Sequence, residues 1–352
     1  MTSKAGKRKA AAGKRPAARP TKAAGRPDGR VAGWSARQVV VGRVSPLART
    51  AGALAAVAAL GLAVRPFLPL ARRTDGGALG TTAGLLGLLA WLPAIVLLGA
   101  AAYCCLRGVL PRLGLTVIGA SGAVSIGVLL RAIWLLDTDG RSVLDLPVGG
   151  QALRGESYDV GAGLILELVV AAVLIAALLC VLGGWTGTVM EDGGAFERFR
   201  PAFGVIGLFL GVFAAVSFSL NSSDSPVGIA PETVTGQAGL DRIGGLILAA
   251  VVVICCIVAS TVRPWLASIG TFLGLFGMLF GLAVENCVVV GRSADLTMSF
   301  GAGSQLAAAV LVLAAGLIAG ALTSRTENDI PATPAPKRPQ AAKNKKRARV
   351  GG

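Results

Sequence analysis

Eight apolar stretches, each about as long as a lipid bilayer is thick, constrain this chain more than any other feature. Each runs for roughly 20 residues, enough for a helix to cross a hydrocarbon core about 30 Å thick. Inside lipid the backbone must satisfy its own hydrogen bonds, so such stretches fold as helices. The strand-like alternation of a membrane β-barrel is absent. The predicted spans cover residues 50–70, 79–105, 113–136, 160–184, 202–220, 243–261, 265–290 and 302–323.

The positive charge of the chain lies in two tails. Residues 1–49 contain 13 lysines and arginines against one acid, and residues 324–352 contain eight against two. These tails carry +12 and +6, although the whole protein carries only +16. With few large apolar residues, such segments are expected to be disordered. The predicted organisation is a disordered basic tail (1–45), a first membrane repeat (46–186), a linker (187–200), a second membrane repeat (201–323) and a second disordered basic tail (324–352).

Loop charges orient the predicted spans, because lysine and arginine collect on the cytoplasmic side of a membrane. Both tails are basic, and even numbers of crossings bring Arg107 and Arg263 to the side of the tails. Residues 137–159 hold five acids against two arginines and suit the opposite side. Arg72 and Arg73, after the first span, are the exception. We therefore expect eight crossings with both termini in the cytoplasm.

The two groups of four spans share landmarks that indicate an internal duplication. Pro111 and Pro264 precede the third and seventh spans and are 153 residues apart. Arg131 and Glu285, 154 residues apart, lie near the far ends of the same two spans. Units of four spans are related by an axis along the membrane normal, so the repeat is parallel. The second and sixth spans also each contain an adjacent cysteine pair: Cys104, Cys105, Cys255 and Cys256.

Small residues line one face of the third and seventh spans. They recur every three or four residues, and at 3.6 residues per turn they share a helix face. Such faces let membrane helices approach closely, so we interpret them as helix-packing surfaces. The next step of each series is a charge, and we expect Arg131 and Glu285 to face each other. The small residues are Gly119, Ala123 and Gly127 in the third span and Gly270, Gly274, Gly277 and Gly281 in the seventh.

A cluster of four charged residues is predicted in the outer third of the spans: Arg65, Arg131, Glu167 and Glu285. Ionisable side chains in a bilayer are costly and usually face the bundle interior or a water-filled cavity. One interpretation is a structural ion pair with side chains that snorkel to the interface. The other is an outward-opening site for a small ion or zwitterion. In that site Arg131 meets an anionic group, while Glu167 or Glu285 carries a cation or proton.

The sequence predicts neither a metal site nor a cofactor. It has no histidine, the commonest metal ligand, and its six cysteines lack the spacing of a zinc site. Walker, GxSxG, HExxH and dinucleotide-binding motifs are absent, and the loops are too short for a soluble catalytic domain. We therefore expect a non-enzymatic protein, with an intramembrane enzyme as the remaining enzymatic alternative.

Two functional hypotheses follow. The first is a multi-pass membrane protein of structural or scaffolding type, whose basic tails contact anionic lipid headgroups or cytoplasmic protein partners. A homo-oligomer is left open, and the lack of aromatic residues in the tails argues against nucleic acid. The alternative is a small-solute or ion transporter that uses the outer-third charge cluster. The Ala-, Gly-, Arg- and Pro-rich composition predicts a bacterial plasma membrane as the location.

Overall fold

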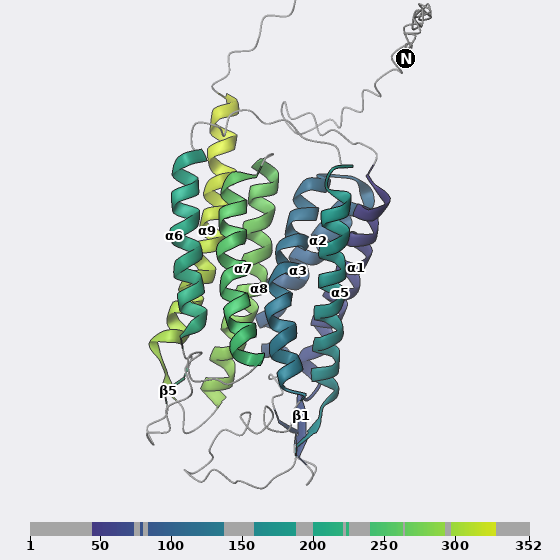
Figure 1. Ribbon diagram of the computed structural model, residues 1–352, viewed down its shortest axis with the longest axis vertical. Coiled ribbons are helices and arrows are strands. Elements are labelled where there is room, and N and C mark those ends of the chain that lie inside the picture. The colour runs from purple at the N-terminus through teal and green to yellow at the C-terminus, as the bar shows by residue number, and fades with distance from the viewer. Residues whose placement is uncertain are drawn as a thin grey trace, which may run out of the picture. The chain divides into compact units, whose positions relative to one another are not determined.

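The computed structural model of the protein describes residues 44–73, 78–79, 84–136, 158–187, 200–220, 223–224, 240–262, 265–292 and 297–328. Within these residues, eight helices are long and apolar enough to cross a membrane (Figure 1). The prediction of an all-α, multi-pass integral membrane protein is therefore confirmed. Most of the two basic tails and most of the linker predicted from the sequence lie outside the described residues, although the last helix extends to Asn328, into the predicted second tail.

The helices and strands have the following bounds. The helices are α1 (Pro46–Val64), α2 (Leu85–Arg107), α3 (Pro111–Trp134), α5 (Ala162–Gly184), α6 (Arg200–Ser219), α7 (Leu240–Thr261), α8 (Trp265–Arg292) and α9 (Phe300–Asn328), with a 3-10 turn, η1 (Arg65–Phe67), directly after α1. The strands are β1 (Ala71–Arg73), β2 (Ala78–Leu79), β3 (Tyr158–Val160), β4 (Ser223–Asp224) and β5 (Thr297–Met298).

The first helix begins and ends where local chemistry requires. The Ser45 hydroxyl accepts a hydrogen bond from the Ala48 amide at 3.1 Å, and Pro46 occupies the first helical position. Both are favoured at a helix N-terminus. Pro66 has no amide hydrogen to donate, so the α-helix ends at Val64 and the chain tightens into η1. The first span therefore ends earlier than the sequence predicted, and Arg65 lies in the turn.

The two ends of the helix bundle differ. The start of α1 and the end of α9 lie at the same end of the bundle, which we call the tail end, whereas β1 and β5 lie at the other, the strand end (Figure 1). At the strand end β1 pairs antiparallel with both β2 and β3, and β4 pairs with β5. The sequence did not predict these strands, because two or three residues are too short to show an alternating pattern.

The described helices form two groups with the same internal order. In the first group, α1 and α3 each pack against both α2 and α5. In the second group, α6 and α8 each pack against both α7 and α9. The groups meet where α3 packs against α8, α2 against α8, and α3 against α7. The spans of α3 and α8 are 61% and 67% buried, more than those of the other six helices, so these two helices form the centre of the bundle.

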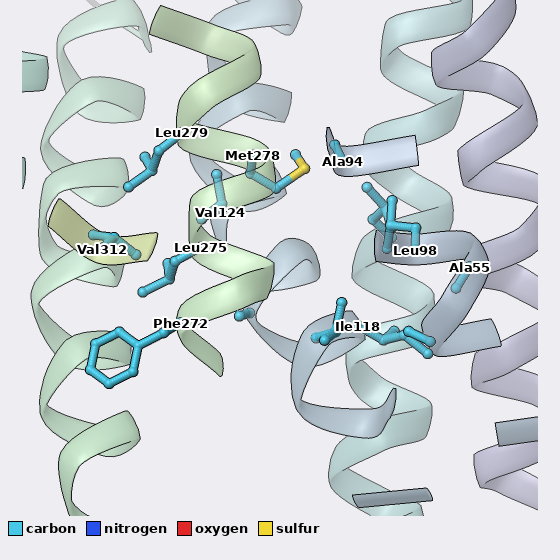
Figure 2. Packing of buried hydrophobic residues seen from close by; sticks show 14 of the residues in the cluster. Ala55, Ala94, Leu98, Ile118, Val124, Phe272, Leu275, Met278, Leu279 and Val312 are labelled. Carbon is cyan, nitrogen blue, oxygen red and sulfur yellow. The ribbon is translucent and has the colours of Figure 1, made fainter. Parts of the chain in front are cut away.

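Buried apolar side chains of both helix groups pack together in the core. Figure 2 shows Ala55, Ala94 and Leu98 on one side and Phe272, Leu275 and Leu279 of α8 on the other, with Met278 between them. These side chains are all buried. In lipid, association of helices depends on such van der Waals contact rather than on exclusion of water. The core is therefore expected to be sensitive to added volume.

The glycine face of α8 packs against two different helices. Towards the tail end, Gly270 lies against Thr116 of α3. A Cβ on Gly274 would come within 2.5 Å of the Val117 carbonyl oxygen and 3.0 Å of the Ala120 Cβ. Nearer the strand end, Gly277 and Gly281 lie against α2, where a Cβ on Gly281 would be 2.6 Å from the Trp91 ring. The backbone of α8 therefore contacts both neighbours where it carries glycine.

The small residues of α3 do not face those of α8, contrary to the arrangement predicted from the sequence. Gly127 lies against Gly244 and Leu248 of α7, whereas Gly119 and Ala123 are only half-buried. The face of α3 that meets α8 is a neighbouring one, which includes Val117 and Ala120. Periodicity places the small residues on one face of α3, but it does not say which helix covers that face.

A buried hydroxyl in α8 provides the first testable prediction. Ser268 is fully buried, and its Oγ has no hydrogen-bond partner within the described part of the chain. An unsatisfied buried hydroxyl costs about 1–3 kcal/mol. We expect Ser268→Ala to raise the free energy of unfolding by about 1 kcal/mol, measured by chemical denaturation in detergent micelles. Ser125 donates to the Ser121 carbonyl oxygen at 2.8 Å, so the control Ser125→Ala should bring no gain. A less stable Ser268→Ala variant would contradict this account.

Candidate intramembrane ion network

A buried arginine at the strand end is the centre of the polar site. Arg65 is only 6% exposed, in the η1 turn that Pro66 imposes after α1. A charge withdrawn from water in a membrane-spanning segment requires partners, since an unpaired one is strongly destabilising. The described residues supply these partners from three other helices.

The Arg65 guanidinium donates to two carboxylates. Its Nη2 and Nε donate to Glu167 Oε2 of α5 at 2.8 and 3.2 Å, and its Nη1 donates to Glu285 Oε2 of α8 at 2.8 Å. The Glu167 and Glu285 side chains are only 17% and 12% exposed. Hydrogen bonds between charged groups are short and roughly twice as strong as neutral ones. We call Arg65, Glu167, Glu285 and Trp91, described next, the ion network.

Trp91 of α2 completes the ion network. Its indole Nε1 donates to the same Glu285 oxygen at 3.1 Å, and the Arg65 Cζ lies 5.6 Å from the centroid of its ring. An arginine within about 6 Å of an indole face gains a cation–π attraction. Trp91 was not among the residues predicted from the sequence, although a tryptophan within an apolar span carries an N–H that needs an acceptor. The need of this N–H for an acceptor could have identified Trp91 as a polar-site residue from the sequence.

The ion network joins the two helix groups. Arg65, Trp91 and Glu167 belong to the first group, whereas Glu285 belongs to the second. The link therefore holds the strand end of α8 against α1, α2 and α5. Together with the contact of Gly281 against Trp91, it fixes both the backbone and the side chains of α8 at this point.

The structure brings together three of the four residues of the predicted charge cluster. Arg131 of α3 is exposed, and its aliphatic stem lies against Gly244 of α7. The cation that contacts Glu285 is Arg65, so the predicted pairing of Arg131 with Glu285 is wrong. The physical reason is that the two helices have different neighbours towards the strand end. There α8 packs against α2 and α3 packs against α7, which separates the two charges.

A neutral polar pair occupies the second helix group at the adjacent position of α8. The Asn286 amide donates to Gln305 Oε1 of α9 at 2.9 Å, and Gln305 donates to the Leu220 carbonyl oxygen, just after α6, at 3.3 Å. Neither residue was among the predicted site residues. Consecutive side chains of α8 thus bind opposite groups, Glu285 the first and Asn286 the second. The strand end of α8 is anchored on both sides.

Little space adjoins the ion network. A cavity of about 20 Å³ is bounded by Arg65, Glu167, Trp91 and Ser125 together with apolar side chains that include Met278 of α8. A cavity of this size holds about one water molecule. In the part of the chain that the structure describes, no group of three potential metal-ligating side chains is found.

A second buried arginine lies at the tail end. Arg112, in the first turn of α3, is 1% exposed, and its Cζ is 4.2 Å from the centroid of the Trp185 ring that follows α5. This cation–π contact joins α3 to α5 within the first group. Arg107 at the end of α2 lies in the same region, with its Cζ 6.0 Å from the Tyr103 ring. The tail end of the first group is thus marked by arginine and aromatic side chains.

These features define the class: a membrane protein with eight spans, whose two four-helix groups are joined by an intramembrane ion network. No protein-family model, curated protein or solved structure matches the chain. Its function is therefore inferred from its own geometry.

Proposed function

We propose that this protein is a non-enzymatic membrane scaffold: a closely packed eight-helix platform that presents two basic tails on one side. The observation that carries the proposal is that the ion network is internally bonded and has little space beside it. Its charged side chains are bonded to one another, and the space beside them is about 20 Å³, too small for a solute larger than water. A cross-linked interior with so little space beside the charges suits a structural role.

The tail end is proposed to face the cytoplasm of a bacterial cell. The first helix starts and the last helix ends at this end, so the basic tails leave the bundle on one side. Arg107 and Arg112 are at the same end, which agrees with the preference of arginine and lysine for the cytoplasmic side. A plasma membrane location follows from this orientation and from the composition of the chain.

The tails are proposed to contact anionic lipid headgroups or an acidic cytoplasmic protein. Basic residues near an anionic membrane surface contribute about 1 kcal/mol each, and the attraction weakens as salt is added. With +12 and +6, the two tails supply enough charge for firm but salt-sensitive binding. The platform would then hold the membrane surface or a partner beside the bundle.

An internal duplication is proposed as the origin of the platform. The contacts between the groups follow a twofold pattern: α3 meets α8, its counterpart, while the contact of α2 with α8 mirrors that of α7 with α3. The offset of 154 residues that relates Arg131 to Glu285 also relates Ala120 to Gly274, and these two residues lie in contact. In a twofold interface, residues at the axis contact their own equivalents. This pattern supports two related four-helix units joined as in a symmetric dimer.

A second candidate function is ion transport. The observation that favours it is the net negative charge of the ion network. Two glutamates share one arginine in a membrane-spanning region. An excess negative charge there attracts a small cation. Glu285 and Glu167 are the residues that would carry it.

Removal of the first basic tail tests the scaffold proposal. We expect a variant that lacks residues 1–43 to lose most of its binding to phosphatidylglycerol vesicles when it is held in phosphatidylcholine nanodiscs, because the larger basic tail is gone. Co-sedimentation at low and high salt measures this binding, with phosphatidylcholine vesicles as the control. Unchanged binding to phosphatidylglycerol would contradict the scaffold proposal.

A flux measurement tests the transport alternative. In proteoliposomes, the scaffold proposal predicts that the wild type moves protons and sodium no faster than the double variant Glu167→Gln, Glu285→Gln. A flux that depends on both glutamates, with both proteins inserted equally, would instead establish transport.

A further inference from the structure

The pair Arg72 and Arg73 is left unexplained by the proposed orientation. Both residues belong to β1, at the strand end, whereas Arg107, Arg112 and the basic tails favour the tail end. In a membrane protein, arginines on the non-cytoplasmic side run against the usual distribution. Arg65 nearby is already engaged with Glu167 and Glu285, so the ion network does not account for this pair.

An apolar groove lies on the surface of the first helix group, between α1 and α5. Its volume is about 270 Å³, and all the residues that line it are aliphatic or glycine: Val57, Ala58, Leu60, Gly61, Val64, Leu166, Val169, Val170 and Val173. Leu60 is 69% exposed and Val169 is 50% exposed, so the groove opens away from the bundle. Because both helices span the membrane, this opening faces lipid chains.

The backbone places β1 at one end of this groove. Val64 is the last residue of α1, and β1 follows after η1 and three further residues. The Gly161 amide donates to the Leu70 carbonyl oxygen at 2.9 Å, and the Gly163 amide donates to the Pro69 carbonyl oxygen at 2.8 Å. These bonds hold the segment before β1 against the start of α5. Positions 72 and 73 therefore lie beyond the strand end of the groove, five and six residues after Phe67, where the first candidate span ends.

We propose that an anionic phospholipid occupies this surface, with one acyl chain in the groove and its phosphate at β1. The groove is smaller than the roughly 300–1,000 Å³ of sites for drug-sized ligands and has no polar lining residue, which suits a single hydrocarbon chain. Arginine is the preferred side chain for phosphate. Asp159 of β3 stands opposite Arg72 in the strand register, and the strand pair keeps a net positive charge. This inference goes beyond the scaffold proposal and does not depend on it.

Filling the groove tests the acyl-chain part of the proposal. The full-length protein is reconstituted in equal parts of phosphatidylcholine and phosphatidylglycerol, extracted in mild detergent, and examined by native mass spectrometry. The wild type should retain one phosphatidylglycerol, and the double variant Val57→Phe, Val169→Phe should lose it. The matched control is Val205→Phe, Val216→Phe on α6, where the side chains are 56% and 54% exposed to lipid and the lipid should be retained.

Two outcomes of the groove experiment would overturn the proposal. One is equal retention by the groove-filled variant and the wild type. The other is a dimeric wild type that becomes monomeric when the groove is filled, since a second copy would then be the occupant.

Removing the two positive charges of β1 tests the proposal that the lipid phosphate binds there. The double variant Arg72→Gln, Arg73→Gln should lose its preference for phosphatidylglycerol over phosphatidylcholine by about thirtyfold, at about 1 kcal/mol per arginine. It should still retain a lipid, because the groove is unchanged. An undiminished preference for phosphatidylglycerol would show that the phosphate does not bind at β1.

Discussion

Replacing Arg65 with methionine is expected to destabilise the protein by about 3–5 kcal/mol, the usual consequence of removing one partner from a buried ion pair. The variant leaves the Glu167 and Glu285 carboxylates close together in a membrane-spanning region without their shared cation. Unfolding of the purified protein in bicelles, followed by denaturant titration, measures the loss. We expect it to be among the largest single-residue effects in the chain.

Two further variants identify the cause of that loss. Adding Glu167→Gln and Glu285→Gln to Arg65→Met should restore most of the stability, because no uncompensated charge then remains. Arg107 is exposed, so the matched change Arg107→Met should alter the unfolding free energy little. If Arg65→Met unfolds at the same denaturant concentration as the wild type, the ion network does not stabilise the bundle.

A leucine at Gly274 is expected to separate α3 from α8 and to lower the unfolding free energy by about 3 kcal/mol, at the upper end of the usual overpacking cost. A Cβ at this position would already lie 2.5 Å from the Val117 carbonyl oxygen, and a backbone atom cannot move aside as a side chain can. Thermal unfolding in nanodiscs, together with the yield of monodisperse protein, measures the effect.

Gly99 provides the matched control for this substitution. It lies within α2, is exposed, and has no atom within 4 Å of the position that its Cβ would take. Gly99→Leu should leave the stability unchanged or slightly higher, because leucine favours the helix more than glycine does. Equal destabilisation by both substitutions would show that helix propensity or insertion, rather than the contact between α3 and α8, is responsible.

The number and position of the spans could be predicted because they depend on a local requirement. A run of about 20 apolar residues must form a helix in lipid whatever surrounds it. Pairing of the charged residues depends instead on helix tilt and on which neighbour each face meets. Arg131 and Glu285 occupy corresponding positions in α3 and α8, but the faces that carry them meet different neighbours: Arg131 lies against Gly244 of α7, and Glu285 pairs with Arg65.

Other parts of the site were hidden for different reasons. Trp91 was not among the predicted site residues, and the role of its N–H becomes evident only when α2 and α8 lie side by side. Asn286 and Gln305 are single amides in apolar surroundings, and only the packing of α8 on α9 brings them within 2.9 Å. Sequence periodicity does not show which side chains of helices far apart in the sequence come into contact.

The proposed duplication also clarifies why the ion network is one-sided. Positions related by 154 residues hold opposite charges, arginine at 131 and glutamate at 285. Only the glutamate can accept hydrogen bonds from a guanidinium, so Glu285 of the second group, and not Arg131, joins the network with Arg65. The neutral pair Asn286 and Gln305 is likewise not repeated, because the position 154 residues before Asn286 is Ala132. Symmetric backbones can therefore hold chemically different polar clusters.

The central claim is that the two helix groups meet along α3 and α8, and a cross-link between these helices tests it most directly. Ser125 of α3 and Met278 of α8 border the same cavity of about 20 Å³. Cysteines would replace both residues in a chain whose six native cysteines are alanine, with a protease site inserted in residues 188–199. After oxidation and cleavage, this account predicts that the two halves migrate as one band until reductant is added. Halves that separate without reductant, as expected for the control pair Ser125→Cys, Leu311→Cys, would contradict it.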